Sequence, residues 1–93
     1  MNKFTLITGA GSGLGKEIAL IYAKRNNNLL LVDINENNLN LLKDEINKDY
    51  KDLKVETIAC DLTLKENLKA VLDFTKDNDM FINRVINGAG QIT

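Results

Sequence analysis

The fold of this chain is decided by Thr8-Gly-Ala-Gly-Ser-Gly-Leu-Gly15, a glycine-rich stretch between two patterned segments. Before it, residues 3–8 are β-branched and apolar and have the length of a buried strand. After it, apolar residues recur at helical spacing and predict a helix to about Lys24. These residues are Leu14, Ile18, Ile21 and Tyr22. A glycine turn between a strand and a helix presents free backbone N–H groups and the positive end of the helix dipole, an arrangement that binds phosphate.

The alternation of strand and helix continues beyond this first unit. Residues 29–32 are a continuous apolar run that ends at Asp33, as in a parallel strand covered on both faces. Asn35 is the expected N-cap of the next helix. The apolar stripe of that helix is Leu39, Leu42 and Ile46. Residues 54–59 then predict a third strand.

A third helix and a fourth strand complete the pattern. Thr63 and Glu66 have the spacing of a capping box at a helix start. The expected inner face of this helix is Leu64, Leu68, Val71, Leu72 and Thr75. Residues 77–79 end it, and residues 81–86 predict a strand that leads into Asn87-Gly-Ala-Gly90. The order βαβαβαβ predicts an α/β fold, a Rossmann-like doubly wound parallel sheet with right-handed crossovers and strand order 3-2-1-4.

Composition narrows the class of protein. With 93 residues, 44% of them hydrophobic, the chain suits one small domain over residues 1–93. A net charge of -1 lacks the concentrated positive charge of a nucleic-acid binder. The sequence has no long apolar run and no signal-peptide pattern, so no membrane partner and a cytoplasmic location are expected. With no His and one Cys, the chain cannot form a His triad, an intrachain disulfide or a Cys/His zinc site.

The spacing of the glycine loop distinguishes between known phosphate loops. The P-loop pattern fails because Ala10 and Glu17 stand where it needs Gly and Ser or Thr. The pattern G-x-G-x-x-G/A fails because Leu14 or Lys16 occupies its last position. The pattern T-G-x-x-x-G-x-G does fit, with Thr8, Gly9, Gly13 and Gly15.

With this loop the chain resembles the short-chain dehydrogenase/reductase family. Three further motifs follow in the family's order: the acidic Asp33 after the second strand, Asp61-Leu62 after the third, and Asn87-x-Ala-Gly90 after the fourth. The family usually has a second Asn where this chain has Gly88, so the role of that Asn stays unassigned.

The resemblance implies a dinucleotide site with three parts. The residues implied around the pyrophosphate are Gly9, Ser12, Gly13, Leu14 and Gly15. Asp61 and Leu62 would contact the adenine. The residues implied along the ribose or the central part of the cofactor are Asn87, Ala89 and Gly90.

Asp33 favours NAD over NADP. It stands 18 residues beyond Gly15, close to the spacing of about 20 at which an acidic residue bonds the adenosine ribose. A carboxylate there repels a 2′-phosphate, and neither Ser12 nor Ile34 supplies a positive charge to hold one. The alternative is a purely structural Asp at the end of a strand.

The family's catalytic Ser and Tyr-x-x-x-Lys follow the fourth strand, whereas this sequence stops at Thr93. We therefore expect no catalytic residue in these 93 residues. Tyr50 and Lys54 match Tyr-x-x-x-Lys but precede the third strand, and we give the match little weight. The leading hypothesis is the cofactor-binding part of an oxidoreductase that transfers hydride between a nicotinamide cofactor and a small alcohol or carbonyl substrate. The alternative is a stand-alone nucleotide-binding or regulatory module without catalysis.

The predicted topology also leaves apolar surface uncovered. Two helices would share one face of the sheet, while the third would cover the other face alone. The fourth strand would be an edge with unpaired N–H and C=O groups beside apolar side chains. The chain is therefore expected to form a dimer or a larger homo-oligomer.

Overall fold

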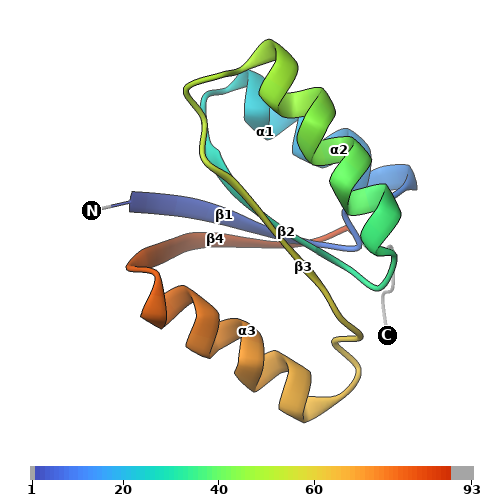
Figure 1. Ribbon diagram of the computed structural model, residues 1–93, viewed down its shortest axis with the longest axis vertical. Coiled ribbons are helices and arrows are strands. Elements are labelled where there is room, and N and C mark those ends of the chain that lie inside the picture. Colours follow the sequence, from blue (N-terminus) through green and yellow to red (C-terminus); the bar gives the residue numbers. More distant parts are fainter. Residues whose placement is uncertain (1, 89–93) are drawn as a thin grey trace.

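The computed structural model describes residues 2–88, which form a parallel sheet with helices on both faces (Figure 1). The strands are β1 (Asn2–Thr8), β2 (Asn28–Asp33), β3 (Val55–Ala59) and β4 (Met80–Asn87). The helices are α1 (Gly13–Lys24), α2 (Glu36–Asp49) and α3 (Lys65–Asp77). The sheet order is β3-β2-β1-β4 with every pair parallel, which confirms the predicted fold class and strand order. Helices α1 and α2 cover one face, and α3 lies on the other.

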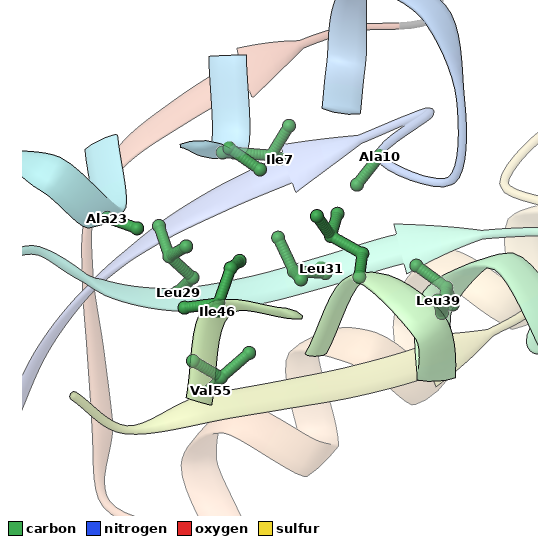
Figure 2. Packing of buried hydrophobic residues seen from close by; sticks show 10 residues of the cluster. Ile7, Ala10, Ala23, Leu29, Leu31, Leu39, Ile46 and Val55 are labelled. Carbon is green, nitrogen blue, oxygen red and sulfur yellow. The ribbon is translucent and has the colours of Figure 1, made fainter. Parts of the chain in front are cut away.

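The centre of the sheet is buried from both sides because β2 lies between β1 and β3. Leu29 and Leu31 point toward α1 and α2 and belong to the larger hydrophobic cluster (Figure 2). Leu30 and Val32 point the other way, into the cluster under α3. All four side chains are at most 1% exposed. The continuous apolar run of this strand is therefore explained by cover on both faces.

Helix α1 packs on the sheet through small residues. Its buried residues are Gly15, Ala19 and Ala23, whereas Leu14 is 60% exposed and Ile21 50% exposed. The predicted helix is confirmed, although its packing on the sheet depends on the small residues and not on Leu14 and Ile21. The helix lies so close to the glycine loop that a Cβ at Gly15 would collide with the carbonyl oxygen of Gly9. At such a short distance, small side chains face the sheet and large ones flank the contact.

Helix α2 follows the prediction. The side chain of its N-cap, Asn35, accepts a hydrogen bond of 3.0 Å from the backbone N–H of Asn38. The predicted stripe of Leu39, Leu42 and Ile46 is buried against the sheet. A local capping signal and a regular apolar period were therefore sufficient to place this helix.

Helix α3 begins one residue later than predicted, and part of its predicted inner face is exposed. Its N-cap is Leu64, and the proposed capping box is wrong because the hydroxyl and N–H of Thr63 both bond to Asp61. Val71 and Thr75 are buried as predicted. The other three residues of the predicted inner face, Leu64, Leu68 and Leu72, are about half exposed. Within residues 2–88, α3 is alone on its face of the sheet, so no second helix covers this flank.

Strand β4 contains an irregularity that changes which side chains share a face. Phe4 pairs with Ile82 and Thr5 pairs with Arg84, so Asn83 is an extra residue in β4. Such a bulge reverses the alternation beyond it. Ile82 accordingly packs in the cluster under α3, whereas Ile86 packs in the cluster under α1 and α2. In a regular strand, these two residues would lie on the same face.

No helix within residues 2–88 has both the length and the apolar character needed to cross a membrane.

Candidate functional site

The candidate site lies where the carboxyl ends of the four parallel strands meet. A pocket of about 540 Å³ opens at this edge of the sheet. Its lining residues are Thr8, Gly9, Val32, Asp33, Ile34, Cys60, Asp61, Leu62, Thr63, Val85 and Asn87. The strand order reverses at β1, because β2 lies on one side of it and β4 on the other. Ligands of open α/β sheets bind at this topological switch point, beyond the carboxyl ends of the strands.

The glycine loop needs glycine for two separate reasons. Gly9 and Gly13 have φ values of 64° and 56°, in the left-handed region that favours glycine. Gly15 is required by close approach, since a Cβ there would collide with the backbone of Gly9. The loop therefore turns tightly from β1 into α1 and keeps the first turn of the helix against the end of the strand.

The first turn of α1 is open to an anion. Ser12 is the N-cap with an extended backbone, and within residues 2–88 its side chain makes no capping hydrogen bond. A Cβ at Gly13 would have no heavy atom within 4 Å among the described residues, so the loop surface here is open. The first N–H groups of a helix have no partner within the helix, and the helix dipole adds partial positive charge. Together with the absence of any acidic residue from the first turn of α1, these features fit a pyrophosphate.

Asp33 connects β2 to the glycine loop and to α2. Its Oδ2 accepts a hydrogen bond of 2.9 Å from the N–H of Gly11, and its Oδ1 accepts one of 2.9 Å from the N–H of Asn35. An ionised carboxylate has about four lone-pair directions, so acceptor capacity is left for ribose hydroxyls. The side chain lines the pocket and is partly exposed. Its position is compatible with the predicted ribose contact.

Asp61 also lines the pocket, after the end of β3. Its Oδ1 accepts two hydrogen bonds from Thr63, one of 2.7 Å from the hydroxyl and one of 2.9 Å from the N–H. These bonds lower the pKa of Asp61, the side-chain bond contributing most. Asn67 donates to the backbone oxygen of Asp61 at 2.8 Å and ties this turn to α3. The turn therefore has a fixed shape beside the predicted adenine contact.

The side of the pocket near Asp61 and Leu62 is largely apolar. Four apolar residues line the pocket there and along the sheet, and the sequence predicted no binding role for them: Val32, Ile34, Cys60 and Val85. Burial and, to a smaller degree, the charge of Asp61 raise the pKa of the Cys60 thiol, which keeps it neutral. Val85 could not be found from a regular strand pattern because the bulge at Asn83 changes its face. Cys60 and Ile34 could have been found, since each adjoins a predicted site residue at a strand end.

The end of β4 is attached to the end of β1. Thr8 donates from its hydroxyl to Asn87 Oδ1 at 3.0 Å, and Gly88 donates from its N–H to the carbonyl of Thr8 at 2.8 Å. A Cβ on Gly88 would lie 2.5 Å from the Cα of Gly15 and 2.8 Å from the Thr8 carbonyl oxygen. Gly88 therefore allows the backbone of β4 to touch the first turn of α1, and the Asn that the family usually has here would not fit this contact.

The structure brings most of the predicted residues to one edge of the sheet. Those that line the pocket are Gly9, Asp33, Asp61, Leu62 and Asn87. Ser12, Gly13, Leu14 and Gly15 lie in the adjoining loop and first helical turn instead. The predictions for Ala89 and Gly90 fall outside the described residues.

The family model of short chain dehydrogenases matches residues 3–93. The chain belongs to this family. It is 36% identical over 90 residues to the 7alpha-hydroxysteroid dehydrogenase of Escherichia coli K12, an alignment that covers 95% of this chain and 34% of that enzyme. The chain thus spans about a third of the length of this curated relative.

Solved structures of oxidoreductases share the fold of the chain. A putative D-mannonate oxidoreductase from Haemophilus influenza with bound NAD superposes with a TM-score of 0.83 and 29% identity, over 99% of this chain and 32% of that one. A short-chain dehydrogenase from Sphingobium yanoikuyae in complex with NADPH gives a TM-score of 0.72 and 32% identity, over 81% of this chain and 29% of that one. The family therefore binds nicotinamide dinucleotides, and both NAD and NADPH occur among these neighbours.

Proposed function

We propose that this chain is the cofactor-binding part of an oxidoreductase that transfers hydride between a nicotinamide dinucleotide and a small alcohol or carbonyl substrate. The observation that carries the proposal is one pocket that combines two kinds of lining: Gly9 of the glycine loop, which adjoins the start of α1, and the strand-end residues Asp33, Asp61 and Leu62. The glycine loop and the start of α1 suit two phosphates, and the strand-end residues suit a ribose with a flat apolar base. When bound, the cofactor supplies the hydride donor or acceptor.

The test uses a matched pair of substitutions at Gly13. Its φ of 56° is one that Asn and Asp tolerate better than other residues, and the space around its Cβ is open within residues 2–88. Gly13→Asp places a negative charge at the proposed pyrophosphate position, whereas Gly13→Asn places a neutral group of the same shape there. Calorimetry should show that Gly13→Asp binds NAD more weakly than Gly13→Asn does. Equal NAD affinity of the two variants would contradict the proposal.

We further propose a preference for NAD over NADP. A 2′-phosphate next to the adenosine ribose would meet the Asp33 carboxylate, whose neighbour Ile34 is exposed and uncharged. Calorimetry on the chain compares the two cofactors directly. Equal affinities for NADP and NAD would refute the preference. Asp33→Ser should reduce the difference in affinity between the two cofactors.

A catalytic role for Tyr50 and Lys54 receives no support from their position. Tyr50 is the C-cap of α2, and the N–H of Lys54 bonds to the side chain of Asn28 at the start of β2. Both residues thus precede β3, at the amino ends of the strands, whereas the pocket lies at the carboxyl ends. The chain alone is therefore proposed to bind cofactor without turnover. The position of Tyr50 and Lys54 away from the pocket also supports the second candidate function, a nucleotide-binding module without catalysis.

Self-association is proposed from the uncovered apolar surface. Leu64, Leu68 and Leu72 form a half-exposed stripe along α3, and Val85 on β4 is 65% exposed. Within residues 2–88, no strand pairs with the outer edge of β4. Light scattering coupled to size exclusion should show a dimer or a larger species. A monomer of 10.4 kDa at every concentration would overturn this proposal.

A further inference from the structure

The glycine loop is attached to β2 at two adjacent backbone positions. The N–H of Ala10 donates to the carbonyl of Val32 at 3.1 Å, and the N–H of Gly11 donates to Asp33 Oδ2 at 2.9 Å. Gly11 is buried, and a Cβ on it would lie 2.9 Å from both the carboxyl carbon and Oδ2 of Asp33. One attachment thus depends on backbone alone, whereas the other depends on a side chain.

The same carboxylate reaches the start of α2. Its Oδ1 accepts the N–H of Asn35, whose own side chain caps α2 through Asn38. A Cβ on Gly11 would also lie 3.1 Å from the Cβ of Asn38, so the loop and α2 are in close contact. Asp33 is therefore bonded both to the loop and to the start of α2.

We propose that Asp33 is a positioning residue for the pyrophosphate as well as a ribose ligand, because it orders the glycine loop before the cofactor arrives. The pyrophosphate in this inference rests on the proposed function, whereas the ordering of the loop by Asp33 does not. The carboxylate holds the middle of the loop through Gly11, so the loop reaches the start of α1 in a fixed shape. A residue that only contacted the ribose would not affect a ligand that lacks a ribose.

The decisive measurement is amide hydrogen exchange by NMR in the ligand-free 93-residue chain. A hydrogen bond to a charged group shifts an opening equilibrium by about tenfold or more. Asp33→Ala should therefore speed exchange of the Gly11 N–H by about tenfold or more. The Ala10 N–H, bonded to the Val32 carbonyl, is the internal control and should change much less. Unchanged Gly11 exchange overturns the proposal, as does equal acceleration at Ala10 and Gly11.

Binding of inorganic pyrophosphate then distinguishes the ordering of the loop by Asp33 from a simple effect of its negative charge. Removal of a nearby negative charge alone should tighten pyrophosphate binding. Loss of loop order should weaken it, and we expect a severalfold weaker affinity in Asp33→Ala. Glu36→Ala, which removes an acidic residue from the first turn of α2 without a bond to the loop, is the matched control. Tighter or equal pyrophosphate binding in Asp33→Ala would overturn the coupling to the anion.

The exchange result stands whatever the cofactor proves to be. If the unaltered chain binds neither pyrophosphate nor NAD, the proposed function fails, while Gly11 exchange still decides the role of Asp33 in the loop. If Asp33→Ala does not fold, Asp33→Asn keeps the size of the side chain and one carbonyl acceptor. That variant should speed Gly11 exchange by a smaller factor, and no change in it would refute the proposal.

Discussion

At Gly88, one added methyl group should disturb the contact between β4 and the first turn of α1. A Cβ there would lie 2.5 Å from Gly15 Cα and 2.8 Å from the Thr8 carbonyl oxygen. Favourable contacts between carbon atoms lie at about 3.5–4.0 Å, so the backbones must separate by about 1 Å. Neither neighbour is a flexible side chain, and the hydrogen bond from Gly88 to Thr8 holds the same two strands together.

The cost of Gly88→Ala follows from this geometry. Insertion of a methyl group into a close-packed site costs about 1–3 kcal/mol. The lower backbone entropy of Ala in the unfolded chain offsets about 0.4–1 kcal/mol of this. The middle of each range gives an expected net loss of about 1 kcal/mol. For a domain of this size, each kcal/mol lowers Tm by about 4–8 °C.

Thermal unfolding followed by circular dichroism measures this loss, with Ser12→Ala as the control. Ser12 caps the same helix but makes no capping hydrogen bond within the described residues, so its removal should cost less than about 0.5 kcal/mol. Gly88→Asn should cost more than Gly88→Ala, because its side chain is larger. A Tm for Gly88→Ala equal to or above that of the original chain would refute the close contact between β4 and α1.

Three further outcomes follow from the same structure. Leu31→Ala should lower the free energy of unfolding by about 2–5 kcal/mol in urea titration, because Leu31 is fully buried in the larger cluster; a loss below about 1 kcal/mol would contradict that packing. Cys60 should react with iodoacetamide only as the pH rises above the range usual for a free thiol, since burial and Asp61 raise its pKa and the thiolate is the reactive form. NAD should slow the reaction because Cys60 lines the pocket. Reaction at neutral pH as fast as that of a small free thiol would contradict the raised pKa of Cys60. The 93-residue chain should reduce no NAD with a secondary alcohol, and turnover above a buffer blank that is lost in Tyr50→Phe would restore Tyr50 as a catalytic candidate.

Local sequence patterns were sufficient to predict the features that depend on a single helix or strand. The apolar run of β2, the cap at Asn35 and the regular stripe of α2 all appear in the structure as predicted. The strand order followed from general rules on connections in parallel sheets. The described residues of the four motifs also meet at one edge of the sheet, because strand ends and loops bring them there.

Tertiary contacts explain the predictions that were wrong. The apolar period of α1 predicted the helix but not its buried residues, which are small because the contact between Gly15 and Gly9 brings the helix close to the end of β1. Thr63 had the spacing of a cap, but its N–H and hydroxyl both donate to the Asp61 carboxylate, and the N-cap is Leu64. The bulge at Asn83 has no composition signal, so the placement of Val85 in the pocket required the register of β1 and β4.

The central claim is that a nicotinamide dinucleotide binds where the glycine loop meets the carboxyl ends of the strands. Titration of the 15N-labelled chain with NAD, followed by amide chemical shifts, tests it most directly. The largest shifts should fall on Gly13, Gly15, Ile34 and Leu62, while residues at the amino ends of the strands, such as Lys54 and Phe81, should not move. Saturable shifts centred on the amino ends, or none around the glycine loop, would contradict the account.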